Sequence, residues 1–491
     1  MEITSFYFLC FYAVLLLLYY VLPGRCQWVL LLAASAAFYL FGGNGWLILY
    51  PVAAVTVTYG AVRIMDAAES VFWRRAALMA DVVLLIGVLA ALKYVRFNGG
   101  AAIPLGLSFY TFSLVGYAAD VYNKIAEPQK NYAKTALYGF YFPTLISGPI
   151  LRYREDAAQL FVRHPFSYAA VTRGLQRVVW GFFKTFVISE RAAIVANTVF
   201  DSYTSYPGVY IWIGALMFTI QLYTNFSGCM DIVIGISETF GFTMPENFRT
   251  PFFSKSISEY WRRWHITLGV WMKEYVFYPL LRTSLFMKMG KTLRAKCGKK
   301  AGKQLTTFTA MFVLWLSVGL WHGGELKYVI GSGLLHWFYI VTGEVTLPFW
   351  KKVLPRLHIP MQGKAADGFR ILRTFFLVNI GNVFFRAASA GDGAKMLWEG
   401  VRVWNPAALF SAQTGLFSLG LDWVEFGILA VSVALLFVVS VLQQSGSVRD
   451  RIAKKPLAVR WILWYALLFY VILLGNYGPG YSSAEFIYQG F

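Results

Sequence analysis

Long apolar stretches recur along almost the whole chain, and they predict membrane-spanning helices. Each of the longest approaches or reaches the roughly 20 residues that a helix needs to cross a hydrocarbon core about 30 Å thick. These runs occupy residues 5–22, 76–95, 305–321, 424–442 and 461–475. Further candidate spans fall at 27–42, 46–62, 103–122, 136–151, 174–196, 209–226, 228–242, 326–347 and 369–386. The pattern predicts an all-α polytopic membrane protein with about 11 to 14 transmembrane or re-entrant helices.

The composition supports this prediction. Of the 491 residues, 58% are hydrophobic and only 14% are charged, a balance that a water-soluble domain of this length does not normally show. The first apolar segment lacks a basic N-terminal region and a cleavage site of small residues, so we interpret it as a retained helix rather than a removed signal. We expect one membrane-embedded domain over 1–491, with peripheral helices in 1–100, a core in 101–390 and C-terminal helices and a tail in 391–491.

The net charge of +20 is concentrated in three short segments. Residues 282–303, 351–373 and 449–460 contain 8, 6 and 5 Lys or Arg, and together they contain only two acidic residues. Short basic loops beside membrane spans mark the cytoplasmic side and suit anionic lipid headgroups. We therefore expect a multi-pass protein of the cell (inner) membrane, surrounded by the lipid bilayer, with an extracytoplasmic C-terminus. Nucleic acid is a poor candidate partner.

Three of the five histidines, His265, His322 and His336, lie in or beside apolar, aromatic sequence. Ionisable groups inside apolar segments are energetically expensive and mark functional sites by default. His322 ends an apolar segment, and the two glycines that follow it let another backbone or a narrow ligand approach closely. A neutral imidazole there can accept a proton from a hydroxyl nucleophile. The alternative is a histidine that only caps the end of a helix.

His265 lies within SISEYWRRWHITLGVWMKEY (256–275), where Ser256 is suited to begin a helix. Aromatic side chains mixed with basic ones favour an interfacial or partly re-entrant helix, and the alternative is a membrane-surface anchor. His336 follows His322 by fourteen residues, about four helical turns, so the two cannot touch through one helix. We interpret His336 as a residue that packs in the core or supports a site residue from behind.

Polar residues also gather between 225 and 247, at membrane depth. Broken helices at that depth survive only inside protein or along a water-filled cavity. We expect a polar-lined passage toward the histidines, although hydrogen bonds between helices would explain the same residues. The polar residues are Asn225, Ser227, Asp231, Glu246 and Asn247, and the expected helix breaks are Gly228, Gly235, Gly241 and Pro245.

The four cysteines show no paired metal spacing, and two of them, Cys10 and Cys229, lie within apolar segments. We infer neither a zinc site nor a disulfide framework. No metal site is expected elsewhere in the chain.

At these residues the sequence resembles the membrane-bound O-acyltransferase superfamily, and within it the bacterial branch of alginate O-acetyltransferases. Separate stretches carry the resemblance in order along the chain. They are SGPILRYREDAAQL (147–160), NFSGCMDI, MPENFRTPF and EYWRRWHIT within 225–267, GLWHG (319–323), VFFRAAS (383–389) and the terminal FIYQGF (486–491). The resemblance implies helices around a central funnel that opens outward and meets a narrower cytoplasmic tunnel near the family's two histidines, here His322 and His265.

The resemblance also implies an activity. We expect an O-acetyltransferase that takes acetyl from a cytoplasmic thioester, acetyl-CoA or another acyl thioester, and passes it outward for polysaccharide modification, with no bound cofactor. His322 would act as general base, and His265 would orient or polarise the thioester carbonyl. A separate extracytoplasmic acetyltransferase would finish the reaction on the polymer. We expect the substrate-binding residues to be Asn247, Trp264, Trp321 and Arg262.

The terminal motif places a tyrosine, Tyr488, where members of this branch are proposed to relay the acyl group. A phenol needs a base to become a good nucleophile, and His322 could serve as that base if the tail bends back into the funnel. The alternative is an aromatic tail anchored at the membrane interface.

The sequence departs from the branch at 279–300, where PLLRTSLFMKMGKTLRAKCGKK replaces a shorter loop that resembles GGNR. The departure leaves open how the donor or a partner docks on the cytoplasmic side. One alternative function is transfer of D-alanyl or another small acyl group to teichoic acid or another cell-wall polymer. The alternative from another class is a transporter or flippase, which would also need polar residues inside the membrane.

Overall fold

The computed structural model describes residues 3, 5–42, 45–95, 103–411 and 415–477. Within these residues the chain is helical, and the one strand-like feature is a single antiparallel bridge between Phe248 and Trp264. The predicted all-α polytopic class is therefore confirmed. The expected terminal tyrosine, Tyr488, lies outside the described residues.

The helices of the first half are α1 (Phe6–Val21), α2 (Gln27–Leu40), α3 (Leu49–Ala67), α4 (Val71–Tyr94), α5 (Leu107–Tyr122), α6 (Tyr132–Gly139), α7 (Phe142–Ser147), α8 (Ala158–Phe161), α9 (Tyr168–Phe182), α10 (Glu190–Asp201) and α11 (Val209–Thr239). Those of the second half are α12 (Ile257–Trp261), α13 (Ile266–Met272), α14 (Tyr278–Leu281), α15 (Ser284–Cys297), α16 (Lys299–Gly323), α17 (Leu326–Tyr328), α18 (Leu335–Arg356), α19 (Lys364–Arg386), α20 (Ala390–Arg402), α21 (Trp423–Gln443), α22 (Val448–Ala453) and α23 (Leu457–Leu474). π-Helical segments join α9 to α10 (Phe183–Ser189), α13 to α14 (Lys273–Phe277) and α17 to α18 (Val329–Leu334), and another precedes α8 (Tyr153–Ala157).

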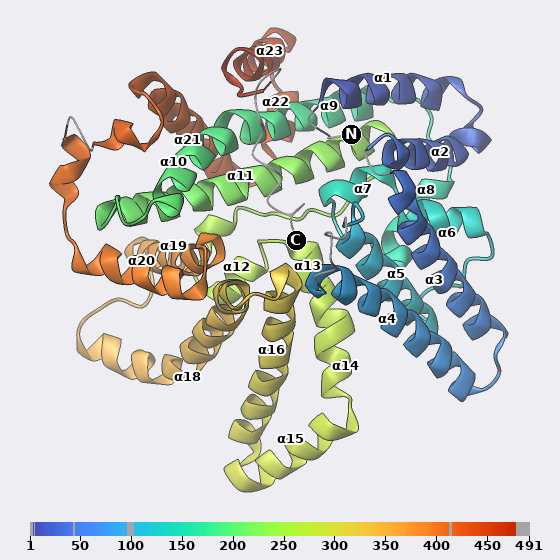
Figure 1. Cartoon of the computed structure of the whole chain (residues 1–491), viewed down its shortest axis with the longest axis horizontal. Coiled ribbons are helices and arrows are strands. Elements are labelled where there is room, and N and C mark those ends of the chain that lie inside the picture. The colour runs from blue at the N-terminus through green and yellow to red at the C-terminus, as the bar shows by residue number, and fades with distance from the viewer. Residues whose placement is uncertain (1–2, 4, 43–44, 96–102, 412–414, 478–491) are drawn as a thin grey trace.

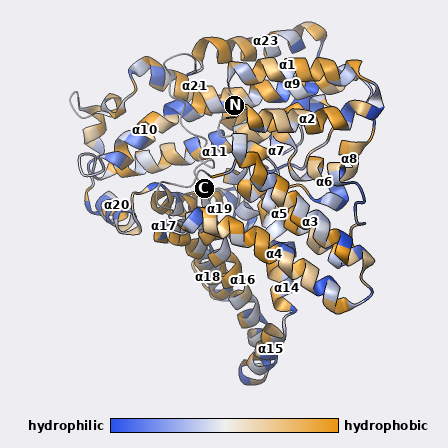
Figure 2. Cartoon of the chain, turned by 45° about the vertical axis from the view of Figure 1, so that its right-hand side comes forward, coloured by the Kyte–Doolittle hydropathy of each residue, from blue (hydrophilic) through white to orange (hydrophobic). Residues whose placement is uncertain are grey.

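Six helices of the described chain are long and apolar enough to cross a membrane by themselves. They are Gly45–Ala67, which includes α3, together with α4, α11, α16, α21 and α23. Figure 2 shows apolar residues over much of the helical surface. Of the other predicted spans, 5–22 and 27–42 form the shorter helices α1 and α2, whereas 369–386 lies within the 23-residue helix α19.

The helices surround a centre where α12 and α13 lie (Figure 1). Helices α9 and α11 run side by side across one part of the molecule, with α21, α22 and α23 beyond them. Helices α3, α4 and α5 pack together in another part, and α15 and α16 form a hairpin that projects from a third. This arrangement brings the ends of several helices toward α13.

One prediction about the centre is wrong: 209–226 and 228–242 form a single helix, α11, and neither Gly228 nor Gly235 breaks it. Both glycines lie where α11 crosses α9. A Cβ added to Gly235 would lie 2.6 Å from the carbonyl oxygen of Gly174, and one added to Gly181 would lie 2.7 Å from that of Gly228. These glycines therefore allow close packing of two backbones, which is a usual role of small residues in membrane helices.

The predicted span at 136–151 is also wrong as a single helix. Helix α6 ends at Gly139, and the short helix α7 starts at Phe142 with Pro143 in its first turn. Proline has no N–H to continue a preceding helix and suits the start of a new one. After α7 the chain contacts the segment that carries His265, since Ile150 N–H donates to Thr267 Oγ1 at 3.1 Å.

Candidate active site

The segment around Asn247 is paired with the segment that carries His265. Arg249 N–H donates to the carbonyl of Arg263 at 2.9 Å, and Ile266 N–H donates to that of Asn247 at 3.0 Å. This pairing interrupts the helix expected over 256–275. Ser256 does cap α12, as expected, by accepting from Glu259 N–H at 3.1 Å, but the helix stops at Trp261 and resumes at Ile266.

His265 itself has a left-handed backbone conformation, with φ 45° and ψ 54°. For a residue with a Cβ this conformation costs roughly 1–2 kcal/mol. Such strain persists only where the surroundings over-determine it, and it is common at functional sites. Here the hydrogen bonds of Asn247 on the C-terminal side and of Arg249 on the N-terminal side fix the backbone on both flanks of the histidine.

Asn247 also orients the His265 ring. Its Oδ1 accepts hydrogen bonds from the backbone N–H and from Oγ1 of Thr267, at 3.0 and 3.1 Å, and lies 3.2 Å from Nδ1 of His265. Because a backbone N–H can only donate, the Asn247 atom that faces it is the oxygen. His265 therefore donates its Nδ1 proton to Asn247, and the neutral ring keeps Nε2 as its proton-accepting nitrogen.

The Trp321 ring lies close to both histidines. Its centroid is 4.6 Å from that of His322 and 6.0 Å from that of His265. The other faces of the site are aromatic as well, because Phe226 lies 4.8 Å from His265 and Phe385 lies 5.3 Å from His322. Both histidines are buried, with exposed fractions of 1% and 3%. The structure thus brings His265 close to Trp321 and His322, which lie more than fifty residues later in the sequence.

His322 lies one residue from the end of α16, close to the surface. Gly323 and Gly324 after it are partly exposed, and Gly324 caps the helix with φ 72°. A Cβ on Gly323 would lie 2.6 Å from the Tyr328 ring, so glycine is needed for this tight ending. Gly323 and Gly324 thus let the rings of Tyr328 and Tyr94 pack closely against the helix end that carries His322.

Two residues of α4 hold the same end of α16, and sequence reasoning missed them. Lys93 donates a hydrogen bond through Nζ to the carbonyl of Trp321, and Tyr94 donates through its hydroxyl to that of Leu320. The Lys93 ammonium also lies 5.3 Å from the centroid of the Trp321 ring. A cation near the C-terminal end of a helix is favoured by the helix dipole. The signal was available in the sequence, since Lys93 is a lone charge in the last turn of an apolar run.

The remaining predicted residues take other positions. Trp264 is buried in an aromatic cluster, 5.0 Å from Phe248 and 5.5 Å from Tyr260 between ring centroids. Arg262 is exposed at the end of α12 and forms no ion pair with a described residue. His336 packs among aromatic rings, 5.0 Å from Trp261 and 5.7 Å from Trp315, as expected. The described residues contain no cluster of three or more His, Cys, Asp or Glu suited to a metal ion.

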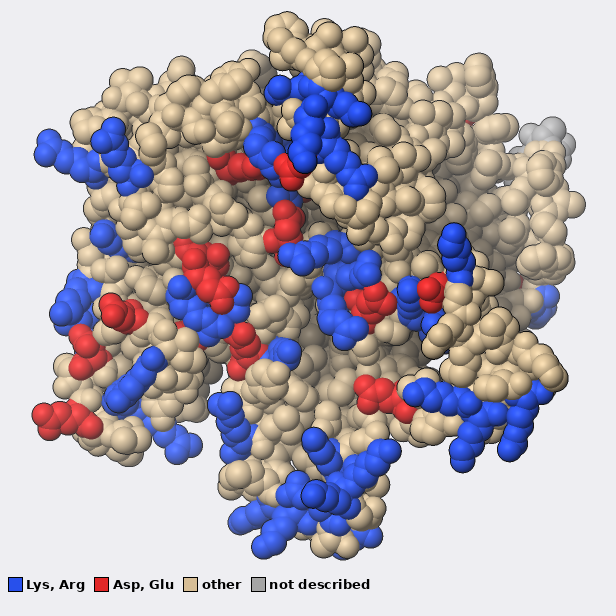
Figure 3. Space-filling view, turned by 180° about the vertical axis from the view of Figure 1, so that it is seen from behind, with Lys and Arg blue, Asp and Glu red and all other residues tan. Residues whose placement is uncertain are grey.

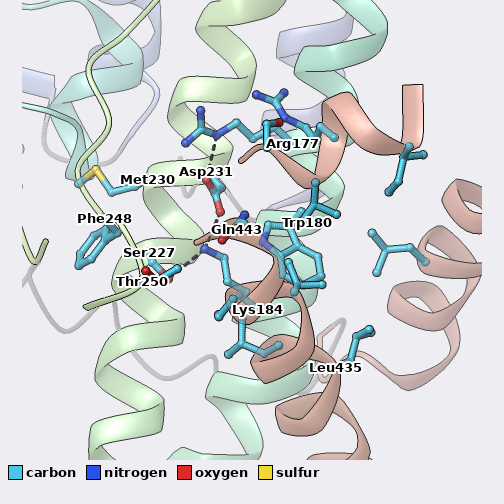
Figure 4. Close-up of a pocket in the computed structure, with 18 of the residues that line it drawn as sticks. Arg177, Trp180, Lys184, Ser227, Met230, Asp231, Phe248, Thr250, Leu435 and Gln443 are labelled. Atoms are coloured by element: carbon cyan, nitrogen blue, oxygen red, sulfur yellow. Dashed lines mark hydrogen bonds and ion pairs between the residues drawn. The ribbon is translucent and has the colours of Figure 1, made fainter. Parts of the chain in front are cut away.

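A pocket of about 780 Å³ lies next to Asn247, between α9 and α11 on one side and α21 and α23 on the other (Figure 4). Four of the five polar residues expected along a passage line it: Ser227, Asp231, Glu246 and Asn247. Neither His265 nor His322 lines it, and Asn247, which does, is fully buried. The pocket is thus adjacent to the histidine site and separated from it by Asn247.

A network of charges forms the polar wall of this pocket, in which Arg177 and Lys184 are buried and Glu246 is partly exposed. Arg177 is bound to Asp231 at 2.8 Å and to both carboxylate oxygens of Glu246 at 2.7 and 2.6 Å. Lys184 contacts Asp231 at 2.5 Å and Ser227 at 2.9 Å. Removing one partner from a buried pair leaves an uncompensated charge. The network therefore ties α9, α11 and the Asn247 segment together.

These features define a class of protein: a membrane-embedded helical protein in which two buried histidines lie near the centre of the helices. A sequence model of the membrane-bound O-acyltransferase family matches residues 126–364, which include both histidines and Asn247. The chain belongs to this family.

Among its relatives is a probable alginate O-acetylase AlgI of Pseudomonas fluorescens, which is 32% identical over 402 residues covering 80% of this chain and 74% of that protein. The protein of the same name from Pseudomonas aeruginosa is also 32% identical, over 81% of this chain and 73% of its own length. A peptidoglycan O-acetyltransferase of Helicobacter pylori is 29% identical over 60% of this chain and 56% of that protein. The chain is a multi-pass membrane acyltransferase.

Proposed function

We propose that this chain takes an acetyl group from a cytoplasmic thioester and passes it across the membrane for O-acetylation of an extracytoplasmic polysaccharide. One observation carries the proposal. The Trp321 ring contacts both His322 and His265, and Asn247 orients the His265 ring. The names of the relatives, an alginate O-acetylase and a peptidoglycan O-acetyltransferase, support acetyl as the group and a polymer as its final acceptor.

In the proposed reaction, His322 accepts the proton of the attacking hydroxyl. The hydroxyl oxygen forms a bond to the thioester carbonyl carbon, the carbon–sulfur bond breaks, and the proton passes from the imidazole to the departing sulfur. General base catalysis of this kind contributes typically about 10² to 10⁴ in rate. Donor candidates are acetyl-CoA and other acyl thioesters, and we propose no bound cofactor.

The role of His265 follows from its hydrogen bond to Asn247. With Nδ1 donating, the neutral ring offers a lone pair at Nε2 and cannot donate from that atom to a carbonyl. This geometry favours an accepting role, such as holding the hydroxyl hydrogen of the acceptor, over the polarising role expected from the sequence. Asn247 and Trp321 then position the two rings, whereas the positions of Trp264 and Arg262 support no direct contact with substrate.

We propose that the three basic segments face the cytoplasm of a cell (inner) membrane protein, with the C-terminus on the other side. Figure 3 supports this orientation, because Lys and Arg side chains spread over the face it shows and gather densely on the protrusion formed by α15. Thioester donors would approach from this side. A separate extracytoplasmic acetyltransferase would receive the acetyl group, and relay through Tyr488 remains part of the proposal.

The test compares His322→Ala with His358→Ala, an exposed histidine in a loop, in cells that lack the native protein. We expect His322→Ala to accumulate in the membrane at normal levels but to abolish ester-linked acetate on the polymer, while His358→Ala acetylates normally. Normal acetylation by His322→Ala would refute the proposed base. Ester-linked D-alanine in place of acetate would support the alternative transfer to teichoic acid or another cell-wall polymer.

A further inference from the structure

The pocket beside Asn247 has an unusual outer wall, formed by α21 and α23. These helices are connected through α22, and Ser432 Oγ lies 3.0 Å from the Tyr470 hydroxyl between them. Only 22% of the α21 span and 6% of the α23 span is buried. Because both helices are apolar and mostly uncovered by protein, this wall faces the hydrocarbon of the bilayer.

The inner surface of this wall is largely apolar. Residues Leu435, Leu436 and Val439 of α21 face the pocket together with Leu463, Trp464, Ala466, Leu467 and Tyr470 of α23. In Figure 4, Leu435 approaches from the side opposite to Ser227 and Asp231. The pocket volume of about 780 Å³ falls within the range of roughly 300–1,000 Å³ that is typical of small-molecule sites.

The other part of the pocket is cationic. Four basic side chains and two acidic ones line it. Arg177 and Lys184 are neutralised by Asp231 and Glu246, as described above, whereas Arg249 is exposed and forms no ion pair with a described residue. Arg449 lines the pocket and is paired with Glu238 at 2.8 Å. Arg249 therefore leaves a net positive charge next to an apolar wall.

The short helix α22, which carries Arg449, is fixed to the core. Arg449 also donates to the carbonyl of Arg173 at 2.8 Å, and Arg173 binds Asp450 at 2.6 Å. The hydrogen bond from Arg173 lowers the pKa of the Asp450 carboxyl below its ordinary value. The positive end of the pocket is therefore held in place by these contacts of α22. Most of α22 belongs to the basic segment 449–460, which suits the anionic lipids of the cytoplasmic leaflet.

We propose that this pocket binds a phospholipid with an anionic headgroup. The phosphate lies at Arg249 and Arg449, and an acyl chain lies along Leu435, Leu436 and Leu467 between α21 and α23. Arginine suits phosphate because its planar group donates two parallel hydrogen bonds. The apolar wall favours this occupant over a water-soluble thioester, and buried Asn247 keeps the lipid apart from the histidines.

The proposal is tested on the full-length protein in mild detergent, by native mass spectrometry with added phosphatidylglycerol or with phosphatidylcholine of the same chains. We expect one phosphatidylglycerol to remain bound under conditions that remove phosphatidylcholine. Arg249→Gln and Arg449→Gln should each weaken retention about fivefold, as expected for one basic residue at an anionic lipid surface. Leu467→Trp, which fills the apolar part, should abolish it.

Lys454→Gln is the matched control, because Lys454 is exposed in the same basic segment but does not line the pocket. It should retain phosphatidylglycerol fully. An equal loss in Lys454→Gln and Arg249→Gln would overturn the proposal, as would equal retention of the two lipids. Displacement by excess coenzyme A would instead assign the pocket to the thioester donor. His322→Ala should bind lipid normally, so failure of the lipid site and failure of the proposed acetyl transfer are distinguishable.

Discussion

The side-chain oxygen of Asn247 lies 3.2 Å from Nδ1 of His265 and also accepts two hydrogen bonds from Thr267. One amide thus fixes the position and the tautomer of a ring that comes eighteen residues later in the chain. The first prediction concerns this amide.

Asn247→Ala should lower acyl transfer on the order of 10²-fold, because a misplacement of a reacting group by about 1 Å has an effect of that size. It should also lower the free energy of unfolding by about 1–3 kcal/mol, since Thr267 loses its acceptor in a buried site. Turnover and thermal unfolding of the purified variant measure the two effects. Asn123→Ala, at an exposed helix end, is the control, and unchanged turnover in Asn247→Ala would contradict the positioning role.

The relative stability of glycine and alanine variants should be opposite at the two histidines. At position 265 the left-handed backbone favours glycine, so His265→Gly should be more stable than His265→Ala by about 0.5–1 kcal/mol. At position 322 the backbone is helical, so His322→Gly should be less stable than His322→Ala by about 1 kcal/mol. Thermal unfolding of the four variants in one detergent tests this. The same order at both positions would exclude a strained backbone at His265.

Loss of the carboxylate shared by Arg177 and Lys184 should be strongly destabilising. Asp231→Asn leaves both cations short of a partner and should lower the free energy of unfolding on the order of 3–5 kcal/mol. Asp66→Asn is the control, because the pair between Arg63 and Asp66 is about one-third exposed and should contribute at most about 1 kcal/mol. Comparable stability of the two variants would show that the network contributes no more than a surface pair.

Membrane orientation can be read from a native cysteine. Cys297 is exposed in the basic α15, so a membrane-impermeant thiol reagent should label it only after the cytoplasmic side is opened. The double variant Cys297→Ser, Glu325→Cys should be labelled at position 325 in intact cells. Glu325 is exposed in the turn after His322, at the other end of α16. Labelling of Cys297 in intact cells would invert the proposed topology.

The apolar runs predicted most helices because length and hydropathy are local properties of the sequence. Helices α4, α16, α21 and α23 begin and end within a few residues of the predicted spans, apart from extensions at their polar ends. The glycines of α11 were misinterpreted because a glycine that breaks a helix and one that admits a neighbouring helix look identical in sequence. Only the crossing with α9 distinguishes them.

The candidate site could be predicted as a set of residues but not as a geometry. His322 and Trp321 are neighbours in sequence, and their proximity is local. The interruption before His265 depends on pairing with the Asn247 segment, a contact that no pattern within 256–275 encodes. Polar residues at membrane depth did indicate a pocket, because four of the five line one. The outer wall of this pocket comes from α21 and α23, which are about 200 residues away in sequence.

The hydrogen bonds from Lys93 and Tyr94 to the end of α16 affect which part of the chain a working fragment must contain. The region that matches the family begins at residue 126, so an excised fragment of residues 126–364 would keep both histidines and Asn247. It would nevertheless lack the ammonium and the phenol that hold the last carbonyls of the helix carrying His322. The amino-terminal quarter of this protein thus helps to hold the helix that carries His322, and we expect its removal to loosen the imidazole without touching any residue of the matched region.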